Sequence, residues 1–430
     1  MREMKDSGIA WIGVIPQDWE IVRTKSLYCS AKEIAGDRAD DFERLALTLN
    51  GVIKRSKEDS VGLQPEKFSG YQILKKGELV FKLIDLENVA TSRVGLSPYT
   101  GIVSPAYIVL SKQSRAKDLV VRYSMYHFLS MWQREIFNQM GDNGVRSSLN
   151  TKELLNIPHP FPSICEQKRI VTFLDAQCAE IDAVLEKTRA SIEEYKKLKQ
   201  AVITQAVTKG IRGDRPMKDS GSVWFEEIPC NWVMKRIKYL FHIKKDIAGK
   251  EGYTVLSITQ SGIKPKDLSK NEGQLADNYS HYQLLNPGDF AMNHMDLLTG
   301  WVDISKYSGV TSPDYRVFVL DDTEKNDSSY YLYLMQMCYF NRIFYGLGQG
   351  VSGMGRWRLQ ADKFLNFPVV VPPVDEQKEI ASYLNEKCSC IEVMIAKKQQ
   401  YLTEIENYKK SLIYEYVTGK KEVKTSVLAD

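Results

Sequence analysis

The chain has 430 residues and a formal net charge of +4, and 43% of its residues are hydrophobic. This length exceeds one ordinary hydrophobic core and predicts two or three domains. No stretch approaches the ~18 apolar residues of a membrane span, and the charged residues after Met1 do not resemble a secretory signal. Seven cysteines without a CxxC spacing indicate reduced thiols, no structural metal and a cytoplasmic location. The mild net charge alone neither establishes nor excludes a nucleic-acid partner.

The sequence contains a tandem repeat. Residues 4–36 align with residues 217–249, with 16 identities in 33 positions. Matches continue in the same order, from Tyr71 with Tyr282 to Glu166 with Glu376, and the offset drifts by only a few residues. We therefore infer a duplication of a unit of roughly 210 residues.

In each copy, about the first 160 residues mix short β-branched or alternating runs with Gly and Pro turns. Such runs occur at residues 45–49, 79–84 and 103–110, and in the second copy at 254–258, 289–293 and 315–320. A helical segment is predicted at residues 119–139 and again at 329–345. This pattern predicts an α/β domain of mixed (α+β) topology in each copy.

The last part of each copy predicts a long helix, because residues 165–208 and 374–418 contain neither Gly nor Pro. At 1.5 Å per residue, about 44 residues give roughly 66 Å. A period of seven predicts that the two helices form an intramolecular coiled coil. Thr188 and Lys398 interrupt its seam, which otherwise consists of Leu174, Ile181, Tyr195, Val202, Leu384, Ile391, Ile405 and Leu412. The alternative is that each helix packs flat on its own domain.

Two finer features of the helices follow from spacing. A second, weaker series of seam positions is predicted at Ile170, Gln177, Val184, Ser191 and Leu198. Ser163 and Glu166 have the spacing of a capping box at the start of the first long helix.

Sequence motifs for catalysis are absent or out of context. Residues 348–353 formally satisfy GxGxxG, but they follow an aromatic helical segment and not a strand. The sequence has no GxxxxGK[ST], GxSxG or HExxH motif, and the five histidines show no ligand spacing. We therefore expect a non-catalytic chain without a metal or cofactor of its own.

Three doubled motifs carry a resemblance to a known family. They are the MKDSG…W…IP…W segments at residues 4–19 and 217–232, the P-x-x-x-EQK segments at 162–168 and 372–378, and the VT segments at 207–210 and 417–420. In this order, and repeated, they resemble the specificity subunit of type I restriction–modification systems. The resemblance covers all but about the last ten residues.

The resemblance implies the following organisation. Residues 1–163 and 214–373 would be target-recognition domains, each reading one half of a bipartite double-stranded DNA site. Residues 164–213 and 374–420 would form an antiparallel coiled coil that sets the spacing and docks two methyltransferase subunits, and residues 421–430 would be a tail. Motor–nuclease subunits would join for restriction, and S-adenosylmethionine, ATP and Mg would be bound by these partners.

Two other interpretations remain open. The chain could be a pseudo-dimeric coiled-coil scaffold that binds protein partners without reading DNA. It could also be a fragment of an enzyme with a fused methyltransferase, although the complete opening motif near Met4 argues against truncation.

Candidate DNA contacts are polar or basic residues in segments that differ between the copies or that adjoin Gly. A basic loop after the strand at 45–49 is matched with residues 260–266, and Tyr107 and Tyr315 could instead fill the core. The candidates are Asn50, Lys54, Arg55, Lys57, Lys82, Arg93, Tyr107 and Arg146, with Gln260, Lys264, Lys266, Asn293, His294, Tyr315, Arg356 and Arg358 in the second copy.

Charge within the domains suggests how strongly the chain binds DNA by itself. Residues 214–373 hold 18 basic and 18 acidic side chains, so the second domain is formally neutral. Because affinity for DNA grows with the number of phosphates neutralised, we expect weak, salt-sensitive binding by the chain alone. Tight binding is expected only in complex with partner subunits.

Overall fold

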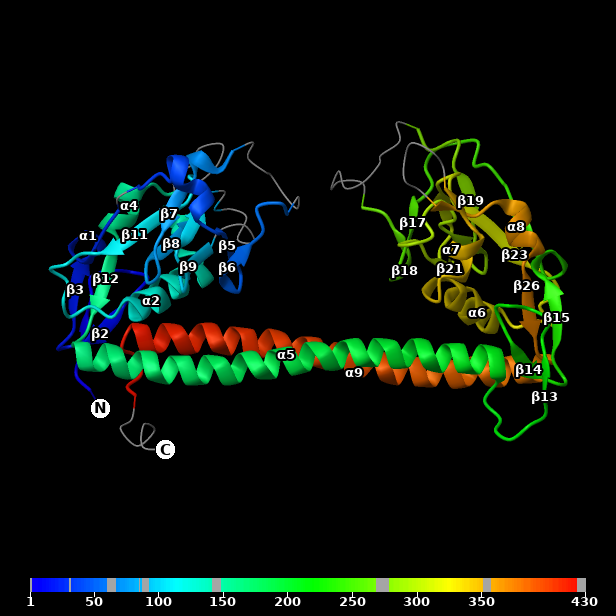
Figure 1. Ribbon diagram of the computed structural model, residues 1–430. Helices are drawn as coiled ribbons and strands as arrows, with labels where there is room; N and C mark the ends of the chain where they lie inside the picture. The colour runs from blue at the N-terminus through cyan, green and yellow to red at the C-terminus, as the bar shows by residue number, and fades with distance from the viewer. Residues whose placement is uncertain are drawn as a thin grey trace. The chain divides into compact units, whose positions relative to one another are not determined.

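A computed structural model of the chain describes residues 2–30, 32–59, 67–84, 86, 93–140, 148–267, 278–350 and 357–423. The chain divides into two compact units (Figure 1). Unit 1 consists of Met1–Arg189 and Gln400–Asp430, and unit 2 consists of Ala190–Gln399. Each unit thus contains one α/β region and part of each long helix. The domain boundaries given above stay a prediction.

The α/β region of unit 1 contains two four-stranded sheets, in the orders β6-β5-β10-β7 and β4-β11-β8-β9, and two strand pairs, β1-β2 and β12-β3. The strands are β1 Met4–Asp6, β2 Val14–Pro16, β3 Glu20–Arg23, β4 Tyr28–Cys29, β5 Arg44–Thr48, β6 Gly51–Arg55, β7 Gln72–Leu74, β8 Leu79–Lys82, β9 Arg93–Leu96, β10 Gly101–Val103, β11 Ile108–Lys112 and β12 Pro158–Phe161. The helices are α1 Thr24–Leu27, α2 Val121–Gln133, α3 Ile136–Met140, α4 Thr151–Asn156 and the 3₁₀ turns η1 Gly36–Asp41 and η2 Phe68–Gly70.

The α/β region of unit 2 repeats this plan, with the four-stranded sheet β16-β23-β20-β21 and the pairs β13-β14, β15-β26, β17-β18, β19-β22 and β24-β25. The strands are β13 Met217–Asp219, β14 Glu227–Pro229, β15 Val233–Arg236, β16 Phe241–Lys244, β17 Leu256–Thr259, β18 Gly262–Pro265, β19 Gln283–Leu285, β20 Phe290–Met292, β21 Val302–Ile304, β22 Gly309–Thr311, β23 Arg316–Leu320, β24 Gln349–Gly350, β25 Trp357–Arg358 and β26 Pro368–Val371. The helices are α6 Ser328–Phe340, α7 Ile343–Leu347, α8 Ala361–Asn366 and the 3₁₀ turn η3 Ile237–Tyr239. The mixed topology expected from the sequence is confirmed.

Three predicted elements differ in detail. Each predicted helix at 119–139 and 329–345 is two helices, because Glu135 and Arg342 adopt left-handed backbone conformations with φ of 57°. The run at 103–110 is not one strand, since it contains the turn between β10 and β11, where Tyr107 N donates to Ser104 O at 3.1 Å.

The same buried polar contacts hold both α/β regions together. The Gln72 side-chain amide donates to the carbonyls of Ser104 and Tyr107, and that of Gln283 donates to the carbonyls of Ser312 and Tyr315. These bonds fasten the turn after β10 in unit 1 and after β22 in unit 2. The duplication therefore preserved a framework as well as a sequence pattern.

The long helices are α5, Ile164–Lys209, and α9, Val374–Val417. In unit 1 the rings of Phe173 and Tyr416 lie 4.5 Å apart, and Lys409 Nζ lies 2.6 Å from Asp182 Oδ1. Residue numbers thus rise along α5 as they fall along α9, which makes the pair antiparallel. The expected coiled-coil pairing is confirmed, so the alternative that each helix only packs flat on its own domain is wrong.

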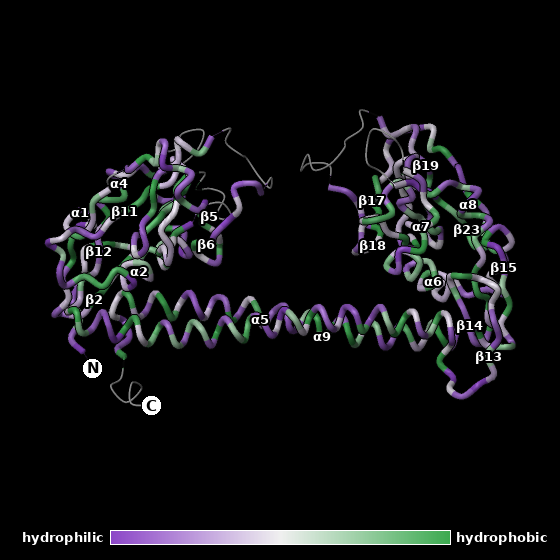
Figure 2. The backbone as a smooth tube through the Cα atoms, in the orientation of Figure 1, coloured by the Kyte–Doolittle hydropathy of each residue, from purple (hydrophilic) through white to green (hydrophobic). Residues whose placement is uncertain are grey.

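Unit 2 shows the same antiparallel pairing at its own end of the two helices. Lys398 Nζ lies 5.6 Å from the ring centroid of Tyr195, and Lys199 Nζ lies 2.5 Å from Glu392 Oε1. Figure 2 shows hydrophobic positions recurring between hydrophilic ones along α5 and α9.

The buried face of α5 corrects the second seam series. Leu185 is 4% exposed, whereas Val184, which was predicted to lie in the seam, is 39% exposed. Cys178 and Ile192 are buried as well, while Leu198 is exposed. Ile170 is buried as predicted, but from Cys178 to Ile192 the buried positions lie one residue later than the predicted series. Among the predicted seam residues, Leu174, Leu384, Ile391 and Leu412 are buried, and Ile181, Tyr195, Val202 and Ile405 are half-buried.

The opening motif of each copy is fastened to the start of a long helix. Trp19 Nε1 donates to Glu166 at 3.0 Å, and Arg2 forms an ion pair with the same carboxylate. The predicted capping box is therefore only half right. Glu166 N donates to Ser163 Oγ at 3.3 Å, but the Glu166 side chain is bonded to Arg2 and Trp19.

Candidate nucleic-acid interface

The predicted basic loop of unit 1 is a strand. β5 and β6 form an antiparallel hairpin in which Thr48 opposes Gly51, and Lys54 and Arg55 belong to β6. Asn50 lies at the tip, and Gly51 has a φ of 91°, a conformation that favours glycine. The loop expectation is wrong for Lys54 and Arg55, because a two-residue turn closes the hairpin before them, whereas Lys57 lies in a turn after β6.

Unit 2 contains the equivalent hairpin, β17–β18, with Gln260 at its tip. Thr259 opposes Gly262, so Gly262 corresponds to Gly51. The sequence alignment matched Lys54 with Lys264, but the hairpin registers show that this match is wrong by one residue. Lys266 is the equivalent of Arg55. Since side chains alternate between the faces of a strand, a shift of one residue exchanges the faces.

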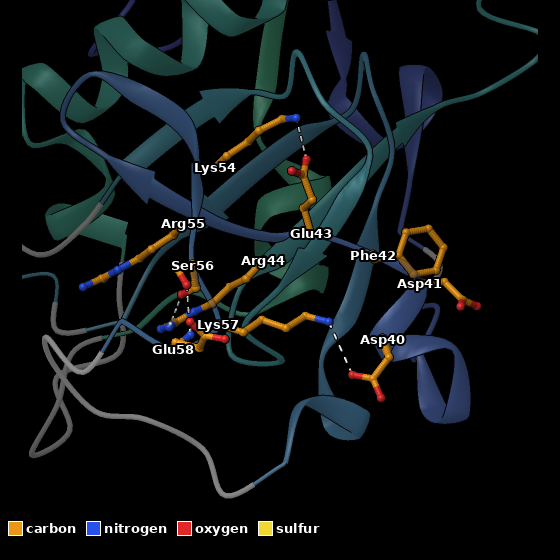
Figure 3. A pocket seen from close by; sticks show the side chains of 10 residues that line it. All are labelled: Asp40, Asp41, Phe42, Glu43, Arg44, Lys54, Arg55, Ser56, Lys57 and Glu58. Carbon is orange, nitrogen blue, oxygen red and sulfur yellow. Dashed lines mark hydrogen bonds and ion pairs between the residues drawn. The ribbon is translucent and has the colours of Figure 1, made fainter.

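The basic residues of the unit 1 hairpin line a pocket together with acidic side chains (Figure 3), which we call the charged pocket. Lys54 Nζ lies 2.5 Å from Glu43 Oε2, and Lys57 Nζ lies 3.4 Å from Asp40 Oδ1. Arg55 Nε lies 2.7 Å from Asp59 Oδ2. The hydrogen bond to Glu43 raises the pKa of Lys54.

These acidic partners were not among the predicted site residues. The sequence feature that could have identified these acidic partners is their position close to the lysines in the chain. Each of these cations already has a counter-charge within the chain, so any external anion would have to compete with a carboxylate.

Three further candidates lie at strand ends. Lys82 and Arg93 oppose each other across the β8–β9 pair, and both are half-buried. Asn293 follows β20, and its side-chain oxygen accepts hydrogen bonds from the backbone amides of Met295 and Asp296, both at 3.2 Å. Asn293 therefore stabilises a turn in this structure.

The two tyrosines are half-buried in equivalent places. Tyr107 packs against the cluster of Leu45, Val80 and Val109, and Tyr315 packs against the corresponding cluster of unit 2. Burial raises the pKa of both hydroxyls. Arg146 and Arg356 lie outside the described residues, as does the end of the GxGxxG run from residue 351.

His294 and Arg358 come together in unit 2. Both line a pocket that also contains Lys244, Lys245 and Arg316, which we call the cationic pocket. Burial, with the charges of Arg316, Arg358 and Lys245, lowers the pKa of His294 to about 3, so the imidazole is neutral at pH 7. Burial lowers the pKa of Arg316 to about 10.

Arg316, Lys244 and Lys245 were missed by the sequence reasoning. Arg316 begins β23, whose remaining residues are apolar. The sequence alone therefore predicts a core strand there and gives no sign of a binding residue. Its equivalent in unit 1 is Ile108. A residue-by-residue comparison of the two copies could have found it.

Among the described residues, no group of three or more His, Cys, Asp or Glu side chains is arranged to hold a metal ion. All seven cysteines fall within the described ranges and are free thiols. Of the helices in the part that the structure describes, none is long and apolar enough to cross a membrane.

Comparison with known proteins agrees with this architecture. Residues 229–404 match the family model described as the type I restriction modification DNA specificity domain. The whole chain is similar to the type I restriction enzyme MjaVIII specificity subunit of Methanocaldococcus jannaschii, with 24% identity over 95% of this chain and 94% of that protein. The chain is thus similar, over nearly its whole length, to type I restriction–modification specificity subunits.

Other matches also extend over nearly the full length of the chain. A putative MjaX specificity subunit from the same organism is 23% identical over 96% of both chains. A solved chain from a study of the assembly and conformational transition of a type I restriction–modification system shares the fold, with a TM-score of 0.67 and 13% identity. That likeness covers 95% of this chain and 99% of the solved chain.

Proposed function

We propose that the chain is the non-catalytic DNA-recognition subunit of its complex, and that each unit reads one half of a bipartite site. One observation carries the proposal: the two units keep the same framework but place different side chains on it. Gln72 and Gln283 make identical turn contacts, whereas Ile108 and Arg316 occupy equivalent strand positions. Two such readers would recognise different half-sites, which makes the target asymmetric.

The long helices would fix the spacing between the half-sites. Both α5 and α9 contribute residues to both units, and their ion pairs recur at equivalent positions. A rigid connection fixes the distance between the two DNA-binding units. Both units could then bind only where the two half-sites have the matching spacing, as for dimeric repressors.

Partner subunits would supply the chemistry. We expect two methyltransferase subunits, which would bind S-adenosylmethionine and dock on the helices, and motor–nuclease subunits that use ATP and Mg. The charged pocket supports this dependence, because its lysines are already paired with Glu43 and Asp40. DNA binding by the chain alone would be weak and would fall steeply with salt.

The test is sequencing of methylated adenines in a host that expresses the chain with its methyltransferase. Replacing residues 38–158 with the matching segment of another family member should change one half-site and preserve the other. The matched control replaces the equivalent residues, 251–368, and should change the other half-site. If either exchange alters both half-sites, or if a soluble complex methylates no defined sequence, the proposal is wrong.

A second measurement addresses the partners. The assembled complex should bind the target sequence found by the methylation experiment tightly in physiological salt. The isolated chain should bind it at least about 100-fold more weakly, because Glu43 and Asp40 already pair with its lysines. Tight, sequence-specific binding by the isolated chain would contradict the expected dependence on partners.

A further inference from the structure

The cationic pocket of unit 2 lies between the edge of β16, the start of β23 and the segment that joins β25 to α8. Its volume is about 560 Å³. His294 follows β20, Arg316 opens β23, and Arg358 ends β25. Three segments that are distant in sequence therefore direct basic or imidazole groups to one cavity.

The charge of this pocket is not balanced as it is in the charged pocket of unit 1. Lys244 is neutralised by Asp289, whose carboxylate lies 2.7 Å from Lys244 Nζ. The described residues that line the cavity include Lys245, Arg316 and Arg358 but no acidic side chain. Three cations thus face the same space without a carboxylate in its lining.

Polar atoms in the pocket also lack hydrogen-bond partners. His294 is 6% exposed, and within the described part of the chain neither its Nδ1 nor Arg358 Nε has a partner. Arg316, equally buried, donates to Leu359 O at 2.9 Å, and its other terminal nitrogen lies 3.9 Å from Met292 Sδ. Buried polar atoms normally have partners, and each unmet one costs free energy.

The framework does not require these side chains. Leu359 N donates to His294 O in unit 2, just as Leu149 N donates to Leu83 O in unit 1. This equivalence places Leu83 where His294 lies and Ser148 where Arg358 lies, and strand register places Ile108 where Arg316 lies. Unit 1 therefore builds the same framework with no charge at these three positions.

We propose that the cationic pocket binds a tetrahedral oxyanion of the phosphate class, and that a DNA backbone phosphate supplies it when unit 2 contacts its half-site. The second part of this inference rests on the proposed function. Arginine forks match the oxygens of phosphate, and an anion would give the unpaired Arg358 Nε an acceptor. The neutral His294 ring can donate one further hydrogen bond. Free phosphate offers the same chemistry, so the experiment separates the two sources.

The first arm titrates inorganic phosphate into the full-length chain and follows the ring signals of isotope-labelled histidine by NMR. His294→Leu identifies the His294 signals, and leucine is the residue at the equivalent place in unit 1. A saturable shift of these signals is expected, and Arg358→Ser should weaken the apparent affinity about tenfold, as for one lost charge-assisted contact. Lys363→Ser, which removes an exposed charge of α8 outside the lining, should leave it unchanged.

The second arm measures binding of a mixed-sequence duplex to the complex with methyltransferase subunits over a range of salt. Loss of one phosphate contact lowers the slope of log K against log salt by about one. Arg358→Ser should show this loss, and Lys363→Ser should not. Arg316→Met provides a second variant if Arg358→Ser does not fold.

The outcomes separate the parts of the inference. Phosphate binding that depends on Arg358, with a reduced salt slope, supports DNA as the source. Phosphate binding with an unchanged slope supports the oxyanion site and assigns it to free phosphate. If phosphate causes no saturable shift at His294, the site is overturned. If the wild-type complex binds no DNA, the proposed function fails while the first arm still tests the pocket.

Discussion

The indole nitrogen of Trp19 donates a 3.0 Å hydrogen bond to the carboxylate of Glu166, which is buried at the start of α5. Unit 2 repeats this contact, since Trp232 Nε1 donates to Glu376 at 3.0 Å. An arginine near the start of each copy, Arg2 or Arg215, completes the contact as an ion pair. The strongest sequence match between the copies thus marks the junction of the opening motif with the long helix.

Replacement of Glu376 by Gln should destabilise unit 2 by about 1–3 kcal/mol, because it leaves the half-buried Arg215 without its counter-charge. The glutamine retains an acceptor for Trp232. Chemical denaturation followed by tryptophan fluorescence measures the change. Glu379→Gln is the control, because its ion pair with Arg212 is exposed and should contribute less than about 1 kcal/mol.

Glu376 also predicts an acid dependence. Burial opposes ionisation, but the hydrogen bond from Trp232 and the charge of Arg215 outweigh it and lower the pKa of Glu376 below its usual value near 4.5. The unfolded chain therefore binds the proton first as pH falls, and the stability from Glu376 is present above about pH 4.5 and is lost below it. The unfolding free energy of Glu376→Gln should decline less steeply in this range. An identical decline in both proteins would contradict the assignment.

A histidine pair predicts a separate pH effect in unit 1. His127 and His159 are fully buried, with ring centroids 4.5 Å apart. Burial lowers the pKa of His159 to about 4, and burial together with the neighbouring His159 lowers the pKa of His127 well below its ordinary value. The unfolded chain binds protons below its ordinary histidine pKa of 6.5 while the folded unit does not, so stability falls as pH drops from 6.5 to about 4.

The double variant His127→Leu and His159→Val tests this effect. Leu334 and Val369 occupy the equivalent places in unit 2, so the framework accepts these residues. The variant should be at least as stable as wild type at pH 7, because His127 Nε2 is buried without a partner among the described residues. Thermal unfolding between pH 4 and 7 should show a flatter profile than that of wild type.

Adjacent residues of α5 distinguish the corrected seam from the predicted one. Leu185→Ala should cost about 2–4 kcal/mol, because it removes a buried side chain between the helices. Val184→Ala should change stability by less than about 0.5 kcal/mol, because Val184 is largely exposed. Denaturant unfolding measures both free-energy changes, and equal losses from the two substitutions would contradict the corrected seam.

The charged pocket predicts a gain of DNA affinity. Glu43→Gln removes the carboxylate that pairs with Lys54 and should strengthen binding to a mixed-sequence duplex about two- to tenfold at low salt, since Lys54 becomes available to phosphate. Glu20→Gln, an exposed change of the same charge outside the pocket, is the control. If Glu43→Gln leaves the affinity for DNA unchanged, Lys54 does not contact DNA.

The sequence predicted the features that repeat with a fixed period. Stretches without Gly or Pro located both long helices, their heptads predicted the pairing, and the doubled Trp19 and Trp232 motif located the duplication. The sequence analysis was wrong where a feature depends on the backbone conformation of one residue or on contacts with residues far away in the chain. The breaks at Glu135 and Arg342 require a left-handed backbone, and the shift between Lys54 and Lys264 follows from the hairpin turn. The cationic pocket was only partly predicted, because Arg316 lies in an otherwise apolar strand.

The discontinuity of unit 1 has a consequence for synthesis of the chain. Unit 2 is one uninterrupted stretch, Ala190–Gln399, and it can assemble its core while the final residues are still in the ribosome. Unit 1 cannot, because Tyr123 donates to Val417 O and Lys420 to Ile12 O. Contacts that span so much of the chain form late. The part of unit 1 that precedes Ala190, although translated before unit 2, is therefore completed after it and stays exposed to misassembly for longer.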